Sequence, residues 1–251
     1  ISADEHLAFV AARGQASFLQ LPAWGKVKPE WRSESIGFFD GDTLTGVGLV
    51  LYRQLPKLPR YLAYLPEGPV LDWNRPDVDA HLEALVAHAR RNKAFAVRIG
   101  PTVVHHRWLA PTVKAAIADP GITALSQATP DETTLTGTRV LRTLDHLGWQ
   151  PQAEGHGFAA GQPKFNYQLR LTDAEGAALT DEQLLKGMNQ LWRRNIKKAD
   201  KLGVTVTRGE RADLARFHRI YLETAERDHF TGRGLPYFET MWDALNTEEP
   251  D

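Results

Sequence analysis

The first half of the chain combines two periods of apolar and polar residues. Apolar or β-branched runs bounded by turn residues predict strands, and Asp40-Gly41-Asp42 separates the first two as a hairpin turn. From Val78 to Ala89 apolar residues recur at intervals of three and four, which predicts an amphipathic helix. Ser2 and Glu5 form a capping box that predicts a first helix. The predicted strands cover residues 36–39, 44–52, 61–65 and 95–99, and further helices are predicted at 22–28 and 108–118.

Helical periodicity dominates the second half. Thr180 and Gln183 form another capping box, and apolar residues then keep helical spacing until Gly203, which predicts one long helix with a glycine stop. Further helices are predicted at 214–225 and 237–245. Residues 165–171 and 204–207 are predicted to be strands, so both halves are expected to be mixed α/β.

Loop-like stretches separate the two halves. Residues 119–138 are rich in Pro, Gly, Thr, Ser and Asp, and residues 146–162 carry several glycines with little periodicity. Because 251 residues exceed the usual size of one domain, we predict a first domain at 1–150 and a second at 151–251. The hairpin strands of the first half have no counterparts before Asp251, so the second domain is expected to be incomplete.

Composition and charge exclude some classes of protein. With 30 Lys and Arg against 31 Asp and Glu, a polyanion site has to come from local clustering of cations. The absence of cysteine excludes disulfides, thiolate nucleophiles and Cys-based zinc sites, and it favours a cytoplasmic location. No apolar run approaches the roughly 20 residues needed to span a bilayer, and no basic and apolar leader opens the chain, so neither a transmembrane segment nor an export signal is expected.

The segment around Trp24 and Lys28 allows two interpretations. It can be a short helix on which Trp24 and Trp31 pack inward while Lys26 and Lys28 are solvated. It can also be a basic, aromatic-lined notch for a phosphate-bearing ligand. Periodicity does not separate these alternatives.

A second group of cations lies on the long predicted helix. Like charges four residues apart repel each other by a few tenths of a kcal/mol, roughly, and Asp200 is the one acid within this stretch. This arrangement favours a polyanion partner, with a solvated helix face as the alternative. The cations are Arg193, Arg194, Lys197, Lys198 and Lys201.

Arg233 lies between Gly232 and Gly234 in a predicted turn between helices. The glycines allow the backbone to approach a ligand closely, and a guanidinium makes forked contacts to phosphate or carboxylate. A Gly-rich loop with an exposed arginine is the alternative.

Several catalytic signatures are absent from the sequence. It contains no Walker-type phosphate loop, no G-x-S-x-G elbow and no H-E-x-x-H, which removes the main support for nucleotide hydrolases, serine hydrolases and zincins. The adjacent His105 and His106 cannot both face one metal from a helix, so they are interpreted as surface residues. No metal site and no cofactor is predicted.

Five segments, taken in order, resemble the Fem family of peptidoglycan bridge-forming aminoacyltransferases. This resemblance implies a fold of two GNAT-like domains of mixed α/β class, the second one truncated here. No long charged heptad segment follows Leu202, so the chain is similar to the compact, FemX-like members. The segments are Phe18-Leu19-Gln20, Trp24 to Lys28, Glu67-Gly68-Pro69-Val70, Arg194 to Val204, and Arg233 to Phe238.

The resemblance also implies roles for individual residues. Lys28 and Arg233 match family residues that hold the diphosphate of the peptidoglycan precursor, and Tyr237 and Trp24 match the same binding region. The implied reaction moves an amino acid from aminoacyl-tRNA to the stem-peptide amine of UDP-MurNAc-pentapeptide or lipid II. The basic helix is the candidate tRNA-binding surface. The family residue near the reacting carbonyl would lie beyond Asp251, so the catalytic residues stay unknown.

Two other functions remain open at this stage. An acetyl-CoA-dependent GNAT N-acetyltransferase would normally carry a Gly-rich pyrophosphate turn after a strand, and Gly155-His156-Gly157 is not such a turn. A non-catalytic module that binds tRNA or the precursor is the third candidate. The expected partners are aminoacyl-tRNA and the precursor, the chain is expected to be a monomer, and a peripheral place at the membrane stays open.

Overall fold

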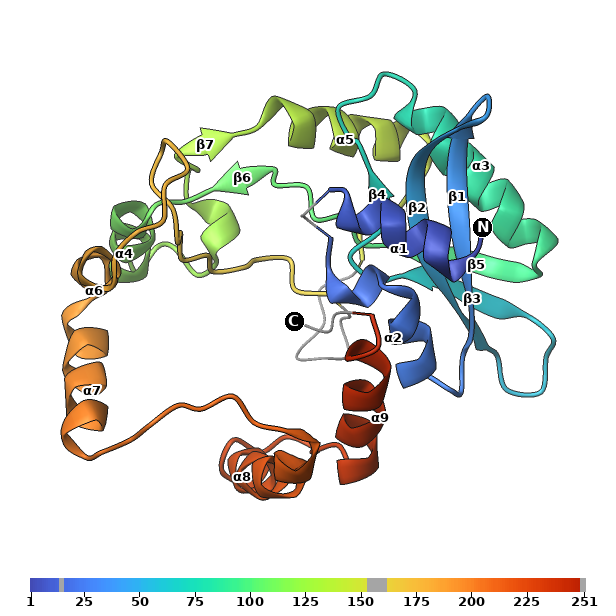
Figure 1. The fold of residues 1–251 in the computed structure, drawn as a ribbon. Helices are drawn as coiled ribbons and strands as arrows, with labels where there is room; N and C mark the ends of the chain where they lie inside the picture. Colours follow the sequence, from blue (N-terminus) through green and yellow to red (C-terminus); the bar gives the residue numbers. More distant parts are fainter. Residues whose placement is uncertain (14–15, 153–161, 249–251) are drawn as a thin grey trace. The chain divides into compact units, whose positions relative to one another are not determined.

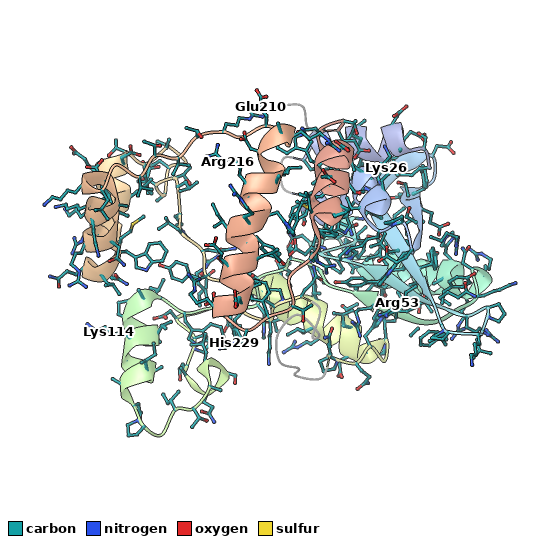
Figure 2. The ribbon with its side chains drawn as sticks, turned by 90° about the horizontal axis from the view of Figure 1, so that it is seen from below. Lys26, Arg53, Lys114, Glu210, Arg216 and His229 are labelled. Carbon is teal, nitrogen blue, oxygen red and sulfur yellow. The ribbon has the colours of Figure 1, made fainter. Side chains whose placement is uncertain are left out.

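The fold is described from a computed structural model of residues 1–13, 16–152 and 162–248 (Figure 1), and Figure 2 shows the side chains of these residues. The helices are α1 (Ala3–Ala11), α2 (Pro22–Val27), α3 (Val78–Arg91), α4 (Ala110–Ala118), α5 (Leu135–His146), α6 (Asp181–Gly187), α7 (Gln190–Lys201), α8 (Leu214–Arg227) and α9 (Leu235–Leu245). The strands are β1 (Arg32–Asp40), β2 (Thr43–Gln54), β3 (Tyr61–Leu65), β4 (Val70–Leu71), β5 (Ala94–Ile99), β6 (His106–Arg107) and β7 (Glu132–Thr133).

The chain forms two compact units. The first contains residues 1–162 and 236–251, and the second contains residues 163–235. The C-terminal helix α9 therefore belongs mainly to the same unit as the N-terminal sheet. The boundary that we predict near residue 150 stays a prediction about the domains of the family fold.

A mixed sheet in the order β1-β2-β3-β5 forms the framework of the first unit. β1, β2 and β3 pair antiparallel, and β3 and β5 pair parallel with α3 as the connection between them. The hairpin turn predicted at Asp40-Gly41-Asp42 is present, and Gly41 has the positive φ of +57° that such a turn requires. The helix predicted from Val78 and the four predicted strands are confirmed.

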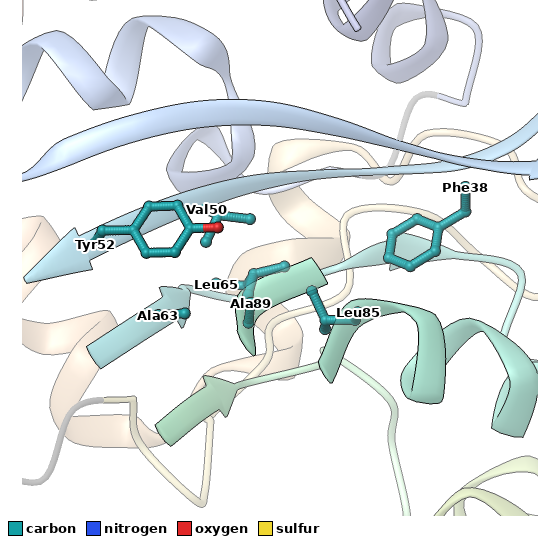
Figure 3. Packing of buried hydrophobic residues seen from close by; sticks show 7 residues of the cluster. All are labelled: Phe38, Val50, Tyr52, Ala63, Leu65, Leu85 and Ala89. Atoms are coloured by element: carbon teal, nitrogen blue, oxygen red, sulfur yellow. The ribbon is translucent and has the colours of Figure 1, made fainter. Parts of the chain in front are cut away.

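One face of the sheet packs against α3 (Figure 3). Val50 and Tyr52 of β2 and Leu65 of β3 meet Leu85 and Ala89 of the helix, and all of them are fully buried. Complete burial of such aliphatic side chains stabilises the fold by about 1.5 to 3 kcal/mol each. The apolar residues that recur every three or four positions along α3 are therefore the ones that pack against the sheet.

The polar end of Tyr52 is satisfied within this layer. Its hydroxyl donates to Glu34 Oε1 over 2.6 Å, and His88 Nε2 lies 2.5 Å from the same oxygen. Burial raises the pKa of Tyr52, and the hydrogen bond to Glu34 adds to this effect.

The opposite face of the sheet packs against α2 and α9. Leu49 and Leu51 of β2 contact Ala23 and Trp24 of α2, together with Ala244 of α9. Because side chains alternate along a strand, β2 supplies both layers from successive residues, which explains its unbroken apolar run.

Gln20 links two segments of the chain that are far apart in sequence. On one edge, β2 pairs with β4 at Gly46 and Val47 and with β3 from Leu51 onward, which leaves a gap at Leu49. The fully buried Gln20 fills this gap: the Leu49 N–H donates to Gln20 Oε1 over 3.0 Å, and Gln20 Nε2 donates to the Pro66 carbonyl over 2.6 Å. A Cβ on Gly68 would lie 2.3 Å from the Gln20 amide carbon, so any larger residue there would displace the Gln20 amide.

The second unit differs from the predictions in its strands. Residues 165–171 and 204–207 form no strand, and the β-structure of the described part of this unit is a single bridge between Thr172 and Ala178. Both strand predictions are therefore wrong. Alternation alone does not make a strand when no neighbouring strand takes up its hydrogen bonds, and Tyr167 is 93% exposed.

The long helix predicted up to Gly203 is in fact two helices. Met188 leaves the helical conformation with a ψ of 152°, and the Asn189 side chain then accepts from the Trp192 N–H and caps α7. Asparagine competes for backbone groups and favours such a cap. The capping box at Thr180 and the stop at Gly203, whose φ is +70°, are confirmed.

Helix α5 was not predicted, since residues up to 138 were interpreted as a loop. Thr134 caps its start by accepting from the Gly137 N–H, and Val140 is its buried apolar residue. A Cβ on Gly137 would lie 2.5 Å from the His105 backbone, so this glycine marks a close contact rather than a loop. The short strands β6 and β7, which pair antiparallel, were also missed.

Candidate ligand-binding surface

Lys28 lies at the end of α2 with its ammonium group over two aromatic rings. Its Nζ is 5.6 Å from the centre of the Trp24 ring and 5.0 Å from that of Tyr237. Both distances are within the range of about 6 Å for a cation–π interaction. Lys28 is half-buried and Trp24 is buried. Trp24 therefore packs inward, as in the first interpretation of this segment, and also lines the site of the cation, as in the second.

The local sequence fixes this arrangement. Pro22 opens α2, and the Ala23 N–H donates to Glu248 Oε2 over 2.8 Å, which ties the end of the described chain to the start of this helix. A Cβ on Gly25 would lie 2.4 Å from Ser33 Oγ, so glycine allows α2 to approach β1 closely. Tyr237 reaches Lys28 because α9 packs on the same layer.

Further cations and rings continue from Lys28 across the sheet. The Trp31 and Tyr64 rings are 6.3 Å apart, the Arg53 guanidinium lies 5.7 Å from the Trp31 ring, and that of Arg98 lies 6.0 Å from the Tyr64 ring. Register places these strand residues on the face that carries Leu51, since Leu51 pairs with Tyr64 and Tyr64 pairs with Arg98. We call these residues the aromatic surface: Trp24, Lys28, Trp31, Arg53, Tyr64, Arg98 and Tyr237.

Charge and burial shape the chemistry of the aromatic surface. Arg53 and Arg98 are exposed, whereas Trp31 and Tyr64 are half-buried. Burial raises the pKa of Tyr64, and the Arg98 charge opposes this shift, so the phenol stays a neutral hydrogen-bond donor around pH 7. Three cations beside flat rings suit an anionic ligand with a planar or sugar-like part. Sequence analysis missed Arg53, Tyr64 and Arg98, because only the pairing register brings them to one face.

Arg233 lies in the second unit. Its side chain is exposed, and its backbone is held on α8: the Arg233 N–H donates to the Tyr221 hydroxyl over 3.1 Å, and His218 Nε2 donates to the Arg233 carbonyl over 2.9 Å. A Cβ on Gly232 would lie 3.0 Å from Leu222, so this glycine permits a close approach to α8. The convergence of Arg233 with Lys28 stays a prediction.

The five predicted tRNA-binding cations are all exposed on α7. Leu191 and Trp192 of the same helix are also exposed, at 53% and 62%. The structure thus shows that these cations are solvated, while their role in binding RNA stays a prediction.

The part of the chain that the structure describes offers no group of three or more His, Cys, Asp or Glu side chains arranged to hold a metal ion. None of its helices combines the length and the apolar character needed to cross a membrane. The predicted surface residues His105 and His106 are half-buried, with ring centres 3.6 Å apart, and burial lowers the pKa of His105.

Comparison with known proteins identifies relatives along the whole chain. It is 32% identical over 251 residues to the lipid II:glycine glycyltransferase of Staphylococcus saprophyticus, and 29% identical to that of Staphylococcus aureus strain MRSA252. Each match covers 99% of this chain and 52% of the relative. A crystal structure of FemX superposes with a TM-score of 0.69 at 27% identity, covering 99% of this chain and 54% of FemX.

The chain thus spans about half the length of the curated relatives that it matches. The sequence profile of the FemAB family matches residues 1–248, which include the aromatic surface, the Arg233 turn and α7. The resemblance inferred from five short segments is confirmed, and the chain belongs to the FemAB family.

Proposed function

We propose that the chain is an aminoacyltransferase that binds the peptidoglycan precursor and moves an amino acid from aminoacyl-tRNA onto the stem-peptide amine of that precursor. The observation that carries this proposal is the half-buried Lys28, whose ammonium lies 5.6 Å from the centre of the Trp24 ring and 5.0 Å from that of Tyr237. A fixed cation with aromatic walls suits a diphosphate attached to a sugar and a base. Relatives named lipid II:glycine glycyltransferase support the reaction class.

The proposed reaction mainly requires that the enzyme position its two substrates. The aminoacyl ester of tRNA is already activated, so the acceptor amine has to be aligned with the ester and the developing oxyanion has to be stabilised. In this proposal Lys28 and Arg233 hold the diphosphate. Arg53 and Arg98 meet further anionic groups of the precursor, such as the carboxylates of its stem peptide.

The second unit has two roles in the proposal. Its helix α7 presents Arg193, Arg194, Lys197, Lys198 and Lys201 to the phosphates of tRNA. In the proposal, residues 151–251 also belong to a second GNAT-like domain. This second domain is supported by the family match, and not by any strand in the described residues.

Titration of the chain with UDP-MurNAc-pentapeptide in a calorimeter tests the proposal. We expect saturable binding with a stoichiometry near one and no comparable binding of acetyl-CoA. UDP-N-acetylglucosamine keeps the diphosphate, the sugar and the base but lacks the peptide, so it should bind more weakly than the precursor. Binding of acetyl-CoA without binding of the precursor would support an acetyltransferase instead. Lipid II in detergent micelles, titrated in parallel, separates a soluble from a lipid-linked acceptor.

A further inference from the structure

The nearly neutral net charge of the chain conceals a strong separation of charge within the first unit. At one end of the sheet, residues 30–34, 54–60 and 90–95 carry six Lys or Arg against two Glu, a net charge of +4. At the other end, residues 40–43 and 71–79 carry five Asp against one Arg, a net charge of −4. The two ends therefore differ by eight charges.

The strand pairing fixes which residues share the positive end. Gln54 pairs with Tyr61 and Tyr61 with Ala94, so the β2–β3 turn lies beside the segment that joins α3 to β5. The Tyr61 N–H donates to the Lys93 carbonyl over 3.2 Å, which connects these two loops directly. Figure 1 shows the end of α3 and the β2–β3 turn on the same side of the sheet.

We call this region the basic end and define it by its exposed side chains. The cations are Lys57, Arg60, Arg90, Arg91 and Lys93. Two apolar side chains lie among them, Leu58 at 54% exposure and Phe95 at 53%. Arg32 is left out of the definition because it pairs with Glu34 and lies over the Tyr52 ring.

The opposite end does not cancel the positive potential. Helix α3 separates the two ends, and its 14 residues correspond to about 21 Å. The Debye length at physiological ionic strength is about 8 Å, so charges at that separation are largely screened from each other. An anionic surface close to the basic end therefore experiences its positive charge almost alone.

Helix stability explains only part of this clustering. Arg90 and Arg91 lie in the last turn of α3, where cations interact favourably with the helix dipole. Lys57 and Arg60 lie in the turn between β2 and β3, and Lys93 follows the end of α3. Among the described residues, none of these three is within 4 Å of a carboxylate.

From these observations we propose that the basic end binds an anionic lipid surface. Leu58 lies in the turn between Pro56 and Pro59, where its half-exposed side chain has Lys57 and Arg60 as neighbours in the sequence. The cations of the basic end are attracted to the acidic headgroups of the lipid. An aliphatic side chain at the tip of a loop can then enter the boundary between the headgroups and the acyl chains. An aliphatic tip gains little from nucleic-acid phosphates, which favours the lipid over RNA. The inference does not depend on the proposed reaction, because the basic end and the aromatic surface share no residue.

Flotation of the chain with lipid vesicles tests this inference. We expect binding to vesicles of phosphatidylcholine with about 30% phosphatidylglycerol, and none to phosphatidylcholine alone, at 0.15 M salt. A Lys or Arg close to an anionic surface is worth about fivefold in binding, so the triple variant Arg60→Gln, Arg90→Gln, Arg91→Gln should bind about a hundredfold more weakly. The matched triple Lys197→Gln, Lys198→Gln, Lys201→Gln, with the same loss of charge on α7, should bind like the wild type.

A fluorescent probe locates the contact. The chain has no cysteine, so Leu58→Cys can be labelled at one position with an environment-sensitive dye. We expect a blue shift of its emission on anionic vesicles and none for a dye at Glu210→Cys, an exposed position in the second unit (labelled in Figure 2). Equal losses in the two triple variants, an unshifted Leu58→Cys probe on floated protein, or affinity for duplex RNA but not for vesicles would each overturn the inference. The vesicles contain no peptidoglycan precursor, so the outcome is independent of precursor binding.

Discussion

The Lys28 ammonium is held by rings from two elements that are far apart in sequence. Trp24 precedes it by one helical turn, and Tyr237 comes from α9. The Phe18 ring meets Trp24 edge to face at 5.3 Å, which fixes the orientation of the indole. Lys26, two residues before Lys28 on the same short helix, is exposed and has no such neighbours among the described residues. These two lysines therefore form a natural pair for comparison.

Replacing Lys28 by Met should weaken binding of UDP-MurNAc-pentapeptide with little effect on the fold. Loss of one charge-assisted contact to phosphate costs about 1.5 to 3 kcal/mol, which is roughly a 10- to 150-fold increase in Kd. Calorimetry measures the affinity, and thermal unfolding reports on the fold. Lys26→Met should bind like the wild type. Equal affinities of the Lys28 and Lys26 variants would refute the role of Lys28.

Replacing Gln20 by Leu should destabilise the protein markedly. The substitution leaves the Leu49 N–H and the Pro66 carbonyl buried without their partner, and each such loss costs about 1 to 3 kcal/mol. We expect the free energy of unfolding in urea to fall by about 2 to 4 kcal/mol. Gln190→Leu at an exposed position should change it by less than about 0.5 kcal/mol. A Gln20 variant as stable as the Gln190 variant would show that β2 tolerates the gap.

His6 should make stability depend on pH in a defined window. Its side chain is buried, and burial lowers its pKa to about 4, an effect that the Gln20 backbone opposes and the N-terminal charge reinforces. Between pH 4 and 6.5 the unfolded state binds the proton and the folded state does not, so stability falls as the pH falls through this window. The loss should reach about 3 kcal/mol at pH 4, from about 1.4 kcal/mol per pH unit.

The variant His6→Gln provides the control for this titration. Glutamine does not titrate, so the difference in unfolding free energy between wild type and variant should change steadily from pH 6.5 to 4. Urea denaturation at several pH values measures this difference. A difference that stays constant with pH would show that another group is responsible for the acid sensitivity.

At the scale of elements, local signals in the sequence were sufficient where one element packs against a clear neighbour. The hairpin β1–β2, strands β3 and β5, and helix α3 all follow from period and turn residues, because a buried face imposes that period. The break at Asn189 and the absence of a strand at residues 165–171 could not be predicted this way. Both depend on whether the backbone N–H and C=O groups find hydrogen-bond partners, and this is decided by the tertiary structure.

In the candidate site, too, some residues could be predicted from local sequence and others could not. Lys28, Trp24 and Arg233 stand out by residue type and by neighbouring glycines, and so they could be named from the sequence. Arg53 and Arg98 lie in strands among apolar residues, and nothing local distinguishes them from solvated arginines. Only the register of β2, β3 and β5 reveals that they share a face with Trp31 and Tyr64.

Helix α7 should bind tRNA through phosphates. We expect the double variant Arg194→Glu, Lys198→Glu to bind tRNA more weakly, because two exposed cations become anions on one helix. Each lost phosphate contact should also flatten the logarithmic dependence of binding on salt by somewhat under one unit. Filter binding across a salt series measures both effects.

A matched reversal on the neighbouring helix α8 controls for overall charge. The double variant Arg216→Glu, Arg219→Glu changes the net charge equally, and both arginines are exposed. It should lower tRNA affinity by no more than the general charge effect, with an unchanged salt slope. Equal behaviour of the two double variants would show that the α7 cations are only a solvated face.

At the scale of the whole molecule, the proposed function requires both compact units. Lys28 and Tyr237 belong to the first unit and Arg233 to the second, and the chain returns to the first unit at Pro236, three residues after Arg233. A ligand that contacts both cations would stabilise one arrangement of the units. The free energy that couples Lys28 to Arg233 through the ligand is therefore a direct measure of this requirement.

A double-mutant cycle on Lys28→Met and Arg233→Met measures that coupling. If both cations hold one diphosphate, each single variant should lose about 1.5 to 3 kcal/mol of binding to UDP-MurNAc-pentapeptide. The double variant should lose less than the sum, with an interaction energy of about 0.5 to 3 kcal/mol, because a ligand released by one cation is poorly placed for the other. The pair Lys28→Met and Lys201→Met serves as the control and should be additive within about 0.5 kcal/mol. Strict additivity for Lys28 and Arg233 would mean that they act on separate parts of the ligand, and an unchanged affinity for Arg233→Met would remove the second unit from the precursor site.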